Sequence, residues 1–153
     1  MPQTKRELVE GWFLEEWDIE PLSHPSWQIK ATHRQNKRII IVSESIDQPE
    51  TVLISAVVEI RSSERQKLDK VAPAIRAAFL QQLRTPFSQQ GVFVDGLPLG
   101  PDQVLHQLVV TRLCRGQLNK PEFLQSVGLI SDCIKILELI EFQQPRPARD
   151  TAH

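Results

Sequence analysis

The sequence is poor in the residues that cross-link a small protein or bind metal ions. Its 153 residues include only two cysteines and four histidines. Cys114 and Cys133 are too few for a disulfide scaffold or a zinc cage. No two histidines lie three or four residues apart, so the three or four convergent ligands of a metal site are missing. We therefore expect two buried free thiols, no metal and no cofactor.

Long apolar runs and an excess of one charge are missing too. No run approaches the ~20 apolar residues that span a bilayer, and the charged N-terminus lacks the apolar core of a signal peptide. The 18 basic and 19 acidic residues give a formal net charge of −1, so no overall field attracts nucleic acid or an anionic membrane. These absences predict a cytoplasmic protein with no membrane or nucleic-acid partner.

The sequence shows no catalytic signature. A nucleophilic site needs a cysteine or serine beside a base, and on one straight strand Cys114 and His106 would lie roughly 26 Å apart. The stretch from Gly96 to Gly100 is interrupted by proline, which favours a turn and not a phosphate-binding loop. We expect no catalytic residue and no enzymatic activity.

What the sequence does contain is a strand-rich stretch from Trp27 to Ile60. Three segments, 27–34, 38–46 and 51–60, alternate apolar and polar side chains or carry runs of β-branched residues, as strands do. The breaks between them are short, and parallel strands would need a long crossover. The stretch therefore predicts a three-stranded antiparallel meander.

Apolar residues at helical spacing predict three helices around this meander. They span residues 5–17, 62–86 and 120–142. Thr4 with Glu7 and Asn119 with Glu122 are capping pairs that begin the first and last helices. Pro73 indicates either a kink in the second helix or a separate turn before it.

The segment between the second and third helices is harder to interpret. Residues 91–94 predict a short strand that ends at a turn over Asp95 and Gly96. Residues 103–113 fit a helix or a strand, and we favour a strand over 104–113 because branched residues are frequent there and a cap is missing. Residues 143–153 have almost nothing to bury and predict a disordered tail, which leaves residues 1–142 as a single α+β domain.

The resulting order, α-β-β-β-α-β-β-α, resembles the type III secretion chaperone-like fold. The resemblance rests on the meander Trp27–Ile60 and on the final strand, the break at residues 118–121 and the helix from Phe123 onward. Bacterial sensory-transduction regulators and small cyanobacterial families of unknown function share this fold. The resemblance implies a small α+β domain, often dimeric, that binds protein segments and has no catalytic residues.

One apolar surface is a candidate for partner binding. The third strand carries apolar residues on both faces, and a monomer of this size rarely exposes such a patch. The candidate dimer surface comprises Leu53, Val57, Ile40 and Val42. A change of register by one residue would bring in Ile39 and Ile41 in place of the last two. We expect a homodimer.

A group of basic residues around the first turn of the meander is the second candidate. It comprises Lys30, Arg34, Lys37 and Arg38, with His33 beside them. These residues could contact an anion or an acidic partner, or they could be edge charges that prevent strand-to-strand aggregation. The sequence as a whole predicts a non-catalytic, chaperone-like or regulatory module for a protein or peptide partner. The alternative is a small-molecule-binding or enzymatic domain that uses the concave face of the sheet.

Overall fold

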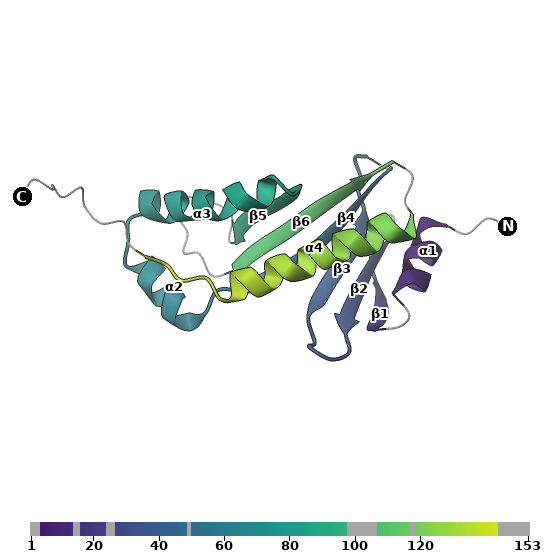
Figure 1. Cartoon of the computed structure of the whole chain (residues 1–153), viewed down its shortest axis with the longest axis horizontal. Helices are drawn as coiled ribbons and strands as arrows, with labels where there is room; N and C mark the ends of the chain where they lie inside the picture. Colours follow the sequence, from purple (N-terminus) through teal and green to yellow (C-terminus); the bar gives the residue numbers. More distant parts are fainter. Residues whose placement is uncertain are drawn as a thin grey trace, which may run out of the picture.

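A computed structural model of the chain describes residues 4–13, 16–23, 27–48, 50–97, 107–116 and 119–143. In this part of the chain, four helices and six strands follow one another in the order α1-β1-β2-β3-β4-α2-α3-β5-β6-α4 (Figure 1). The helices are α1 (Lys5–Trp12), α2 (Ser62–Asp69), α3 (Pro73–Ser88) and α4 (Lys120–Glu138). The strands are β1 (Trp17–Leu22), β2 (Gln28–His33), β3 (Ile39–Glu44), β4 (Thr51–Glu59), β5 (Val92–Leu97) and β6 (Gln107–Arg115).

Strands β4 and β6 form the longest pair of a single antiparallel sheet. The strand order is β1-β2-β3-β4-β6-β5, and each neighbouring pair is antiparallel. The predicted meander is present as β2, β3 and β4. The prediction of an α+β fold with an antiparallel sheet is therefore confirmed, although the described residues form four helices and not three.

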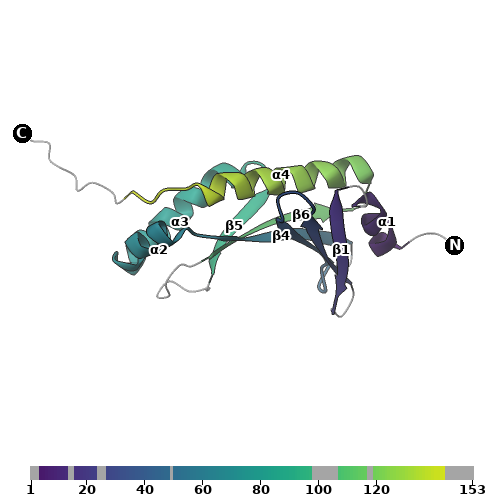
Figure 2. The same cartoon turned by 90° about the horizontal axis from the view of Figure 1, so that it is seen from below.

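The helices leave one face of the sheet open. Figure 2 shows α3 and α4 on the same side of the sheet, with α2 at one end and α1 at the other. Helix α4 packs diagonally across β4 and β6, and α3 packs against β5. The core between α4 and the sheet is built from alternate strand residues and one face of the helix, including Ile29, Ile40, Val42, Ile54, Leu108, Val110, Phe123, Ile130 and Leu137.

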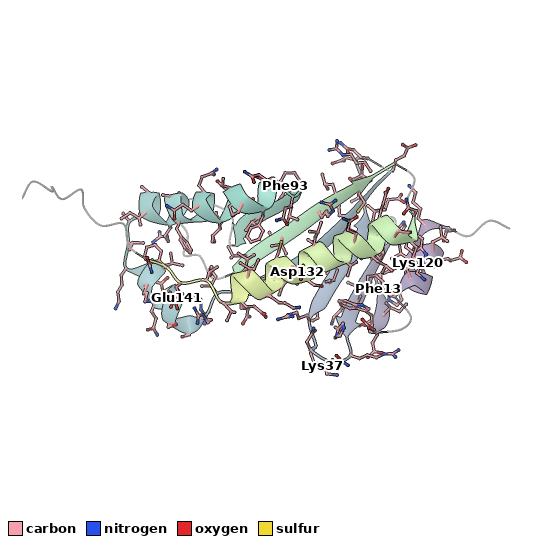
Figure 3. All side chains as sticks on the ribbon, viewed as in Figure 1. Phe13, Lys37, Phe93, Lys120, Asp132 and Glu141 are labelled. Carbon is pink, nitrogen blue, oxygen red and sulfur yellow. The ribbon has the colours of Figure 1, made fainter. Side chains whose placement is uncertain are left out.

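Aromatic rings close the end of this core next to α1. Phe13 is fully buried, and its ring lies 5.3 Å from that of Phe123 and 5.4 Å from that of Trp17. Trp12 also packs on Phe123, at 5.3 Å. Figure 3 shows Phe13 between α1 and the first turns of α4. Edge-to-face ring contacts of this kind fix how α1 meets α4.

The first helix is shorter than predicted, because the chain turns into an additional strand. Helix α1 ends at Trp12, and Trp17 begins β1, which pairs with β2 from Trp17–His33 to Leu22–Gln28. Strand β1 lies at the edge of the sheet, where Pro21 can be accommodated although it has no amide proton to donate. The prediction of a helix over residues 5–17 is wrong in its last turn.

The second predicted helix is two helices, and the later one continues past its predicted end. Pro73 is the first residue of α3, a position where the missing amide proton has no helical partner to lose. The prediction that the helix ends at residue 86 is wrong, since α3 includes Pro86 and ends at Ser88. Phe87 is buried, and its packing holds the last turn in place.

The structure also differs from the sequence predictions around β5 and β6. The predicted turn at Asp95 and Gly96 is wrong, because both residues pair with β6. Strand β6 confirms the prediction of a strand within the described part of residues 104–113. The remainder of that prediction, at 104–106, and residues 98–100 of the proline-interrupted stretch lie outside the described residues.

The last helix ends at Glu138, four residues before its predicted end, because Arg61 at the N-cap of α2 and Glu64 within α2 bind the chain that follows. Arg61 Nη2 donates to the carbonyl of Ile140 at 2.7 Å, and the amide of Phe142 donates to Glu64 Oε1 at 2.8 Å. Phe142 also packs on Phe79, with ring centroids 5.1 Å apart. Of the predicted disordered tail, residues 144–153 lie outside the described residues.

No helix in the described ranges combines the length and the apolar character needed to cross a membrane.

Candidate protein-binding surface

The candidate site is the face of the sheet opposite α4, which we call the open face. Among the described residues, no helix covers it (Figure 2). Its apolar side chains come from four neighbouring strands and comprise Ile39, Ile41, Leu53, Val57, Val109, Leu113 and Phe93. The exposed fraction is 43% for Ile39, 53% for Val57 and 56% for Phe93. Large apolar side chains this exposed are unusual when they lie next to one another.

The register of the sheet brings these side chains together. Val57 pairs with Val109, and Leu53 pairs with Leu113. Side chains of directly opposed residues on one face lie about 5 Å apart. Ile41 pairs with Ser55 on the neighbouring strand. The apolar residues of the open face therefore lie on both sides of a polar row, in which Ser55 of β4 pairs with Thr111 of β6.

Two of the residues predicted for this surface lie on the other side of the sheet. Ile40 and Val42 are fully buried in the core, because the register pairs Val42 with Ile54 and so turns both residues toward the helices. The prediction that they line a partner-binding surface is wrong. Ile39 and Ile41 take their place, while Leu53 and Val57 lie on the open face.

Three residues of the open face were not singled out from the sequence. Phe93, Val109 and Leu113 belong to β5 and β6, which reach the sheet through a non-local pairing with β4. Alternation within 107–113 was a usable signal, because odd-numbered residues there share one face. The neighbouring strand, and hence the extent of the patch, could not be read from the sequence.

Charged side chains flank the patch, and two ion pairs within the chain involve four of them. At one edge, Arg34 Nε lies 3.0 Å from Asp18 Oδ1. At the other edge, Arg84 Nη2 lies 2.7 Å from Asp95 Oδ1. An apolar centre with a polar border is the arrangement found in protein–protein interfaces.

The predicted basic group is dispersed in the structure. Arg38 Nη2 forms an ion pair with Glu138 Oε1 of α4 at 2.6 Å, and Arg34 is paired with Asp18. Lys37 is exposed at the tip of the β2–β3 turn (Figure 3), with a left-handed backbone φ of 61°. The ring of His33 lies 4.8 Å from that of Trp17. Two of the four basic side chains already have a carboxylate partner, so the turn presents less free charge than the sequence indicates.

Comparison with known proteins gives the chain a family. Residues 6–139 match the family described as "Uncharacterized conserved protein (DUF2299)". The chain belongs to this DUF2299 family.

No sequence among the curated proteins matches it significantly. A solved structure described as an uncharacterized protein from Methanothermobacter thermautotrophicus is similar, with a TM-score of 0.69 and 12% identity over 88% of this chain and 94% of that chain. At this identity the likeness shows a shared fold. Neither comparison names the secretion chaperones or a cyanobacterial family.

The described residues of this DUF2299 chain contain no group of three or more His, Cys, Asp or Glu side chains placed to hold a metal ion; His24, His106 and His153 lie outside them. Cys133 is a buried free thiol, as predicted, and burial together with the nearby Asp132 raises its pKa to about 11. Cys114 is only partly buried, so the prediction of two buried thiols is wrong for this residue.

Proposed function

We propose that this protein is a non-catalytic protein-binding module that acts as a cytoplasmic homodimer, and that two copies meet through their open faces. The observation that carries the proposal is the group of exposed apolar side chains on a sheet face over which the described residues place no helix. Val57 and Phe93 are each more than half exposed. Such side chains are stabilised when a partner removes them from water.

The size of the open face fits a second copy of the chain. Strands lie ~4.8 Å apart and each residue adds ~3.3 Å, so six strands of six to nine residues present roughly 600 Å² in projection. The accessible area of a face with protruding side chains exceeds its projection. Specific dimers bury about 800 Å² on each partner. The open face therefore has the dimensions of a standard interface.

The expected driving force is adequate for a dimer at micromolar concentrations. At ~25 cal/mol per Å², burial of several hundred Å² of apolar area contributes on the order of 10 kcal/mol. Association costs of about 4–15 kcal/mol oppose this gain. The balance is consistent with a reversible dimer.

Two acidic residues at the border are already paired within the chain. In a symmetric dimer the same patch is used by both copies, so unpaired charges of one sign would meet. Here Asp18 and Asp95 are both neutralised by arginines of their own chain. The resemblance to the type III secretion chaperones supports the same proposal, since it implies a small dimeric α+β domain that binds protein segments.

Light scattering on two matched variants tests the proposal. Val57→Asp places a carboxylate in the centre of the open face, where Val57 is 53% exposed, and Ile136→Asp does the same on the outer side of α4, where Ile136 is 55% exposed. Neither change puts a charge into the core, so both variants should fold. We expect the wild type and Ile136→Asp to be dimers at tens of micromolar, and Val57→Asp to be a monomer with unchanged circular dichroism.

Two outcomes contradict the proposal. A monomer mass for the wild type shows that the open face does not bind a second copy. A dimer that survives Val57→Asp but dissociates in Ile136→Asp places the interface on α4.

A further inference from the structure

A polar pocket lies at the end of β6, beside the first half of α4. Its volume is about 300 Å³, and its lining consists of residues 112–115 of β6, which include Arg112, Cys114 and Arg115, and of Glu122, Gln125 and Ser126 from α4. The core between α4 and the sheet is otherwise built mainly from apolar side chains. Polar groups placed in such a layer are costly unless they are hydrogen-bonded or serve a function.

The pocket exists because β6 is longer than its neighbour β5. The pairing between the two strands ends at Val92 and Arg112, but β6 continues to Arg115. Beyond Arg112, the place beside β6 that a longer β5 would fill is left to side chains of β6 and α4. Figure 1 shows α4 beginning beside this end of β6.

The guanidinium of Arg112 is held rigidly at this pocket. Its Nε donates to Ser126 Oγ at 2.8 Å, and its Nη1 donates to the carbonyl of Gln90 at 2.6 Å. A Cβ on Gly91 would lie 2.8 Å from Nη1, so this glycine leaves the space that the guanidinium occupies. An arginine fixed in the folded protein loses little further rotamer entropy when it binds a ligand.

Part of the guanidinium is available to a ligand. Arginine has five N–H donors, and the two bonds above use one donor each from Nε and Nη1. Nη2 has no hydrogen-bond partner among the described residues. The remaining Nη1 and Nη2 donors form a planar fork, which matches two oxygens of a carboxylate or phosphate.

We propose that this pocket binds a small molecule through a carboxylate or phosphate group, with Arg112 as the fixed anchor. This goes beyond the proposed function and does not depend on it. Gln125 and Glu122 line the pocket and supply an amide and a carboxylate for the remainder of the ligand. A volume of about 300 Å³ is at the lower end for small-molecule sites, which favours a compact metabolite.

Cys114 provides a built-in reporter. Its Sγ lies 3.5 Å from Ser126 Oγ, the same hydroxyl that holds Arg112. Cys114 is partly exposed, whereas Cys133 is buried with its pKa raised to about 11. A neutral alkylating reagent such as iodoacetamide should therefore label Cys114 and leave Cys133 unmodified, as read by peptide mass spectrometry.

The experiment measures the rate of Cys114 labelling with added succinate or inorganic phosphate. The controls are succinamide, which is uncharged and similar in size, and potassium chloride at matched ionic strength. At a free ligand concentration of about ten times the Kd, mass action slows labelling roughly tenfold. Protection by succinate alone assigns a carboxylate ligand, and protection by phosphate alone assigns a phosphate ligand. No protection by either, or equal protection by potassium chloride, overturns the proposal.

Variants show whether protection arises at Arg112. Arg112→Gln removes the fork and should abolish protection, and Arg112→Lys should not restore it fully because lysine lacks the planar geometry. Gln125→Trp fills the pocket from an exposed position of α4 and leaves the contacts of Arg112 in place, so it remains informative if Arg112→Gln fails to fold. Lys135→Trp, exposed on the same helix away from the pocket, should retain protection. Full protection in Gln125→Trp contradicts the proposed location.

Discussion

Gly91 and Gly116 have the same backbone conformation in different surroundings. Their φ angles are +75° and +79°. A Cβ at Gly91 would lie 2.8 Å from Arg112 Nη1, whereas a Cβ at Gly116 would have no atom within 4 Å. Substitutions at these two glycines therefore distinguish the free-energy cost of a left-handed backbone from the cost of displacing Arg112.

Alanine substitutions at these two glycines should therefore differ in their effect on stability. Gly116→Ala should lower the free energy of unfolding by about 1–2 kcal/mol, the cost of a left-handed L-residue. Gly91→Ala should cost clearly more, because Arg112 must also give up its bond to Gln90. Urea denaturation measures both values, and repeating Gly91→Ala in an Arg112→Gln background should remove the excess. Equal losses for the two variants would show that Arg112 moves aside freely.

Single residues also show the limit of prediction from the sequence. In a strand the side-chain period is two, so a shift of one residue exchanges the two faces. The run from Ile39 to Val42 is apolar at every position, so it gave no evidence of which residues face the core. The location of β3 in the sequence could be predicted, but which of its residues face the core could not.

At the scale of elements, local sequence patterns predicted the structure correctly where contacts with neighbouring elements favoured the same structure. The capping pairs at Thr4 and Asn119 begin α1 and α4 as predicted. Strand β1 was missed because Trp17 falls at helical spacing after Trp12, although Trp17 to Glu20 also alternates with period two. Pairing with β2 selects the strand over the helix for this segment. Beyond α4, contacts with α2 hold the chain in a non-helical conformation.

Glu64 is the element-level contact that connects α2 to the chain beyond α4. Its carboxylate is buried and accepts from the Phe142 amide at 2.8 Å. That bond, with smaller contributions from Ser63 and Lys67, lowers the pKa of Glu64 from its ordinary value of 4.5, against the opposing effect of burial. The ionised form is therefore favoured in the folded state. Its stabilisation is fully present above the unfolded pKa and is lost as the pH falls through the lower folded pKa.

Glu64→Gln should reproduce this pH dependence. At pH 7 we expect it to lower the free energy of unfolding by about 1 kcal/mol, since a neutral acceptor binds the amide more weakly than a charged one. The difference from wild type should shrink as the pH falls below 4.5. Glu141→Gln, which removes an exposed carboxylate from the same segment, is the control and should show little difference. A gap for Glu64→Gln that stays constant with pH would contradict the role of its charge.

At the scale of the whole molecule, the pairing of β6 with β4 decides which surface is available to a partner. These strands are separated in the sequence by α2, α3 and β5. Apolar periodicity indicates that a segment is buried, but it does not say beside which distant strand the segment lies. The apolar patch of the open face, to which four strands contribute, is therefore a property of the assembled sheet that no single segment reveals.

A dimer formed through this face should make thermal stability depend on protein concentration. Dissociation accompanies unfolding when only the folded chain binds its partner, so the dimer gains stability with concentration by mass action, about 2.7 kcal/mol for a hundredfold increase. We expect the Tm of the wild type and of Ile136→Asp to rise between one and one hundred micromolar, as measured by scanning calorimetry. Val57→Asp should unfold at one Tm across this range. A wild-type Tm that does not change with concentration would show that the open face remains exposed to water, and that the fold tolerates Val57 and Phe93 on its surface without a partner.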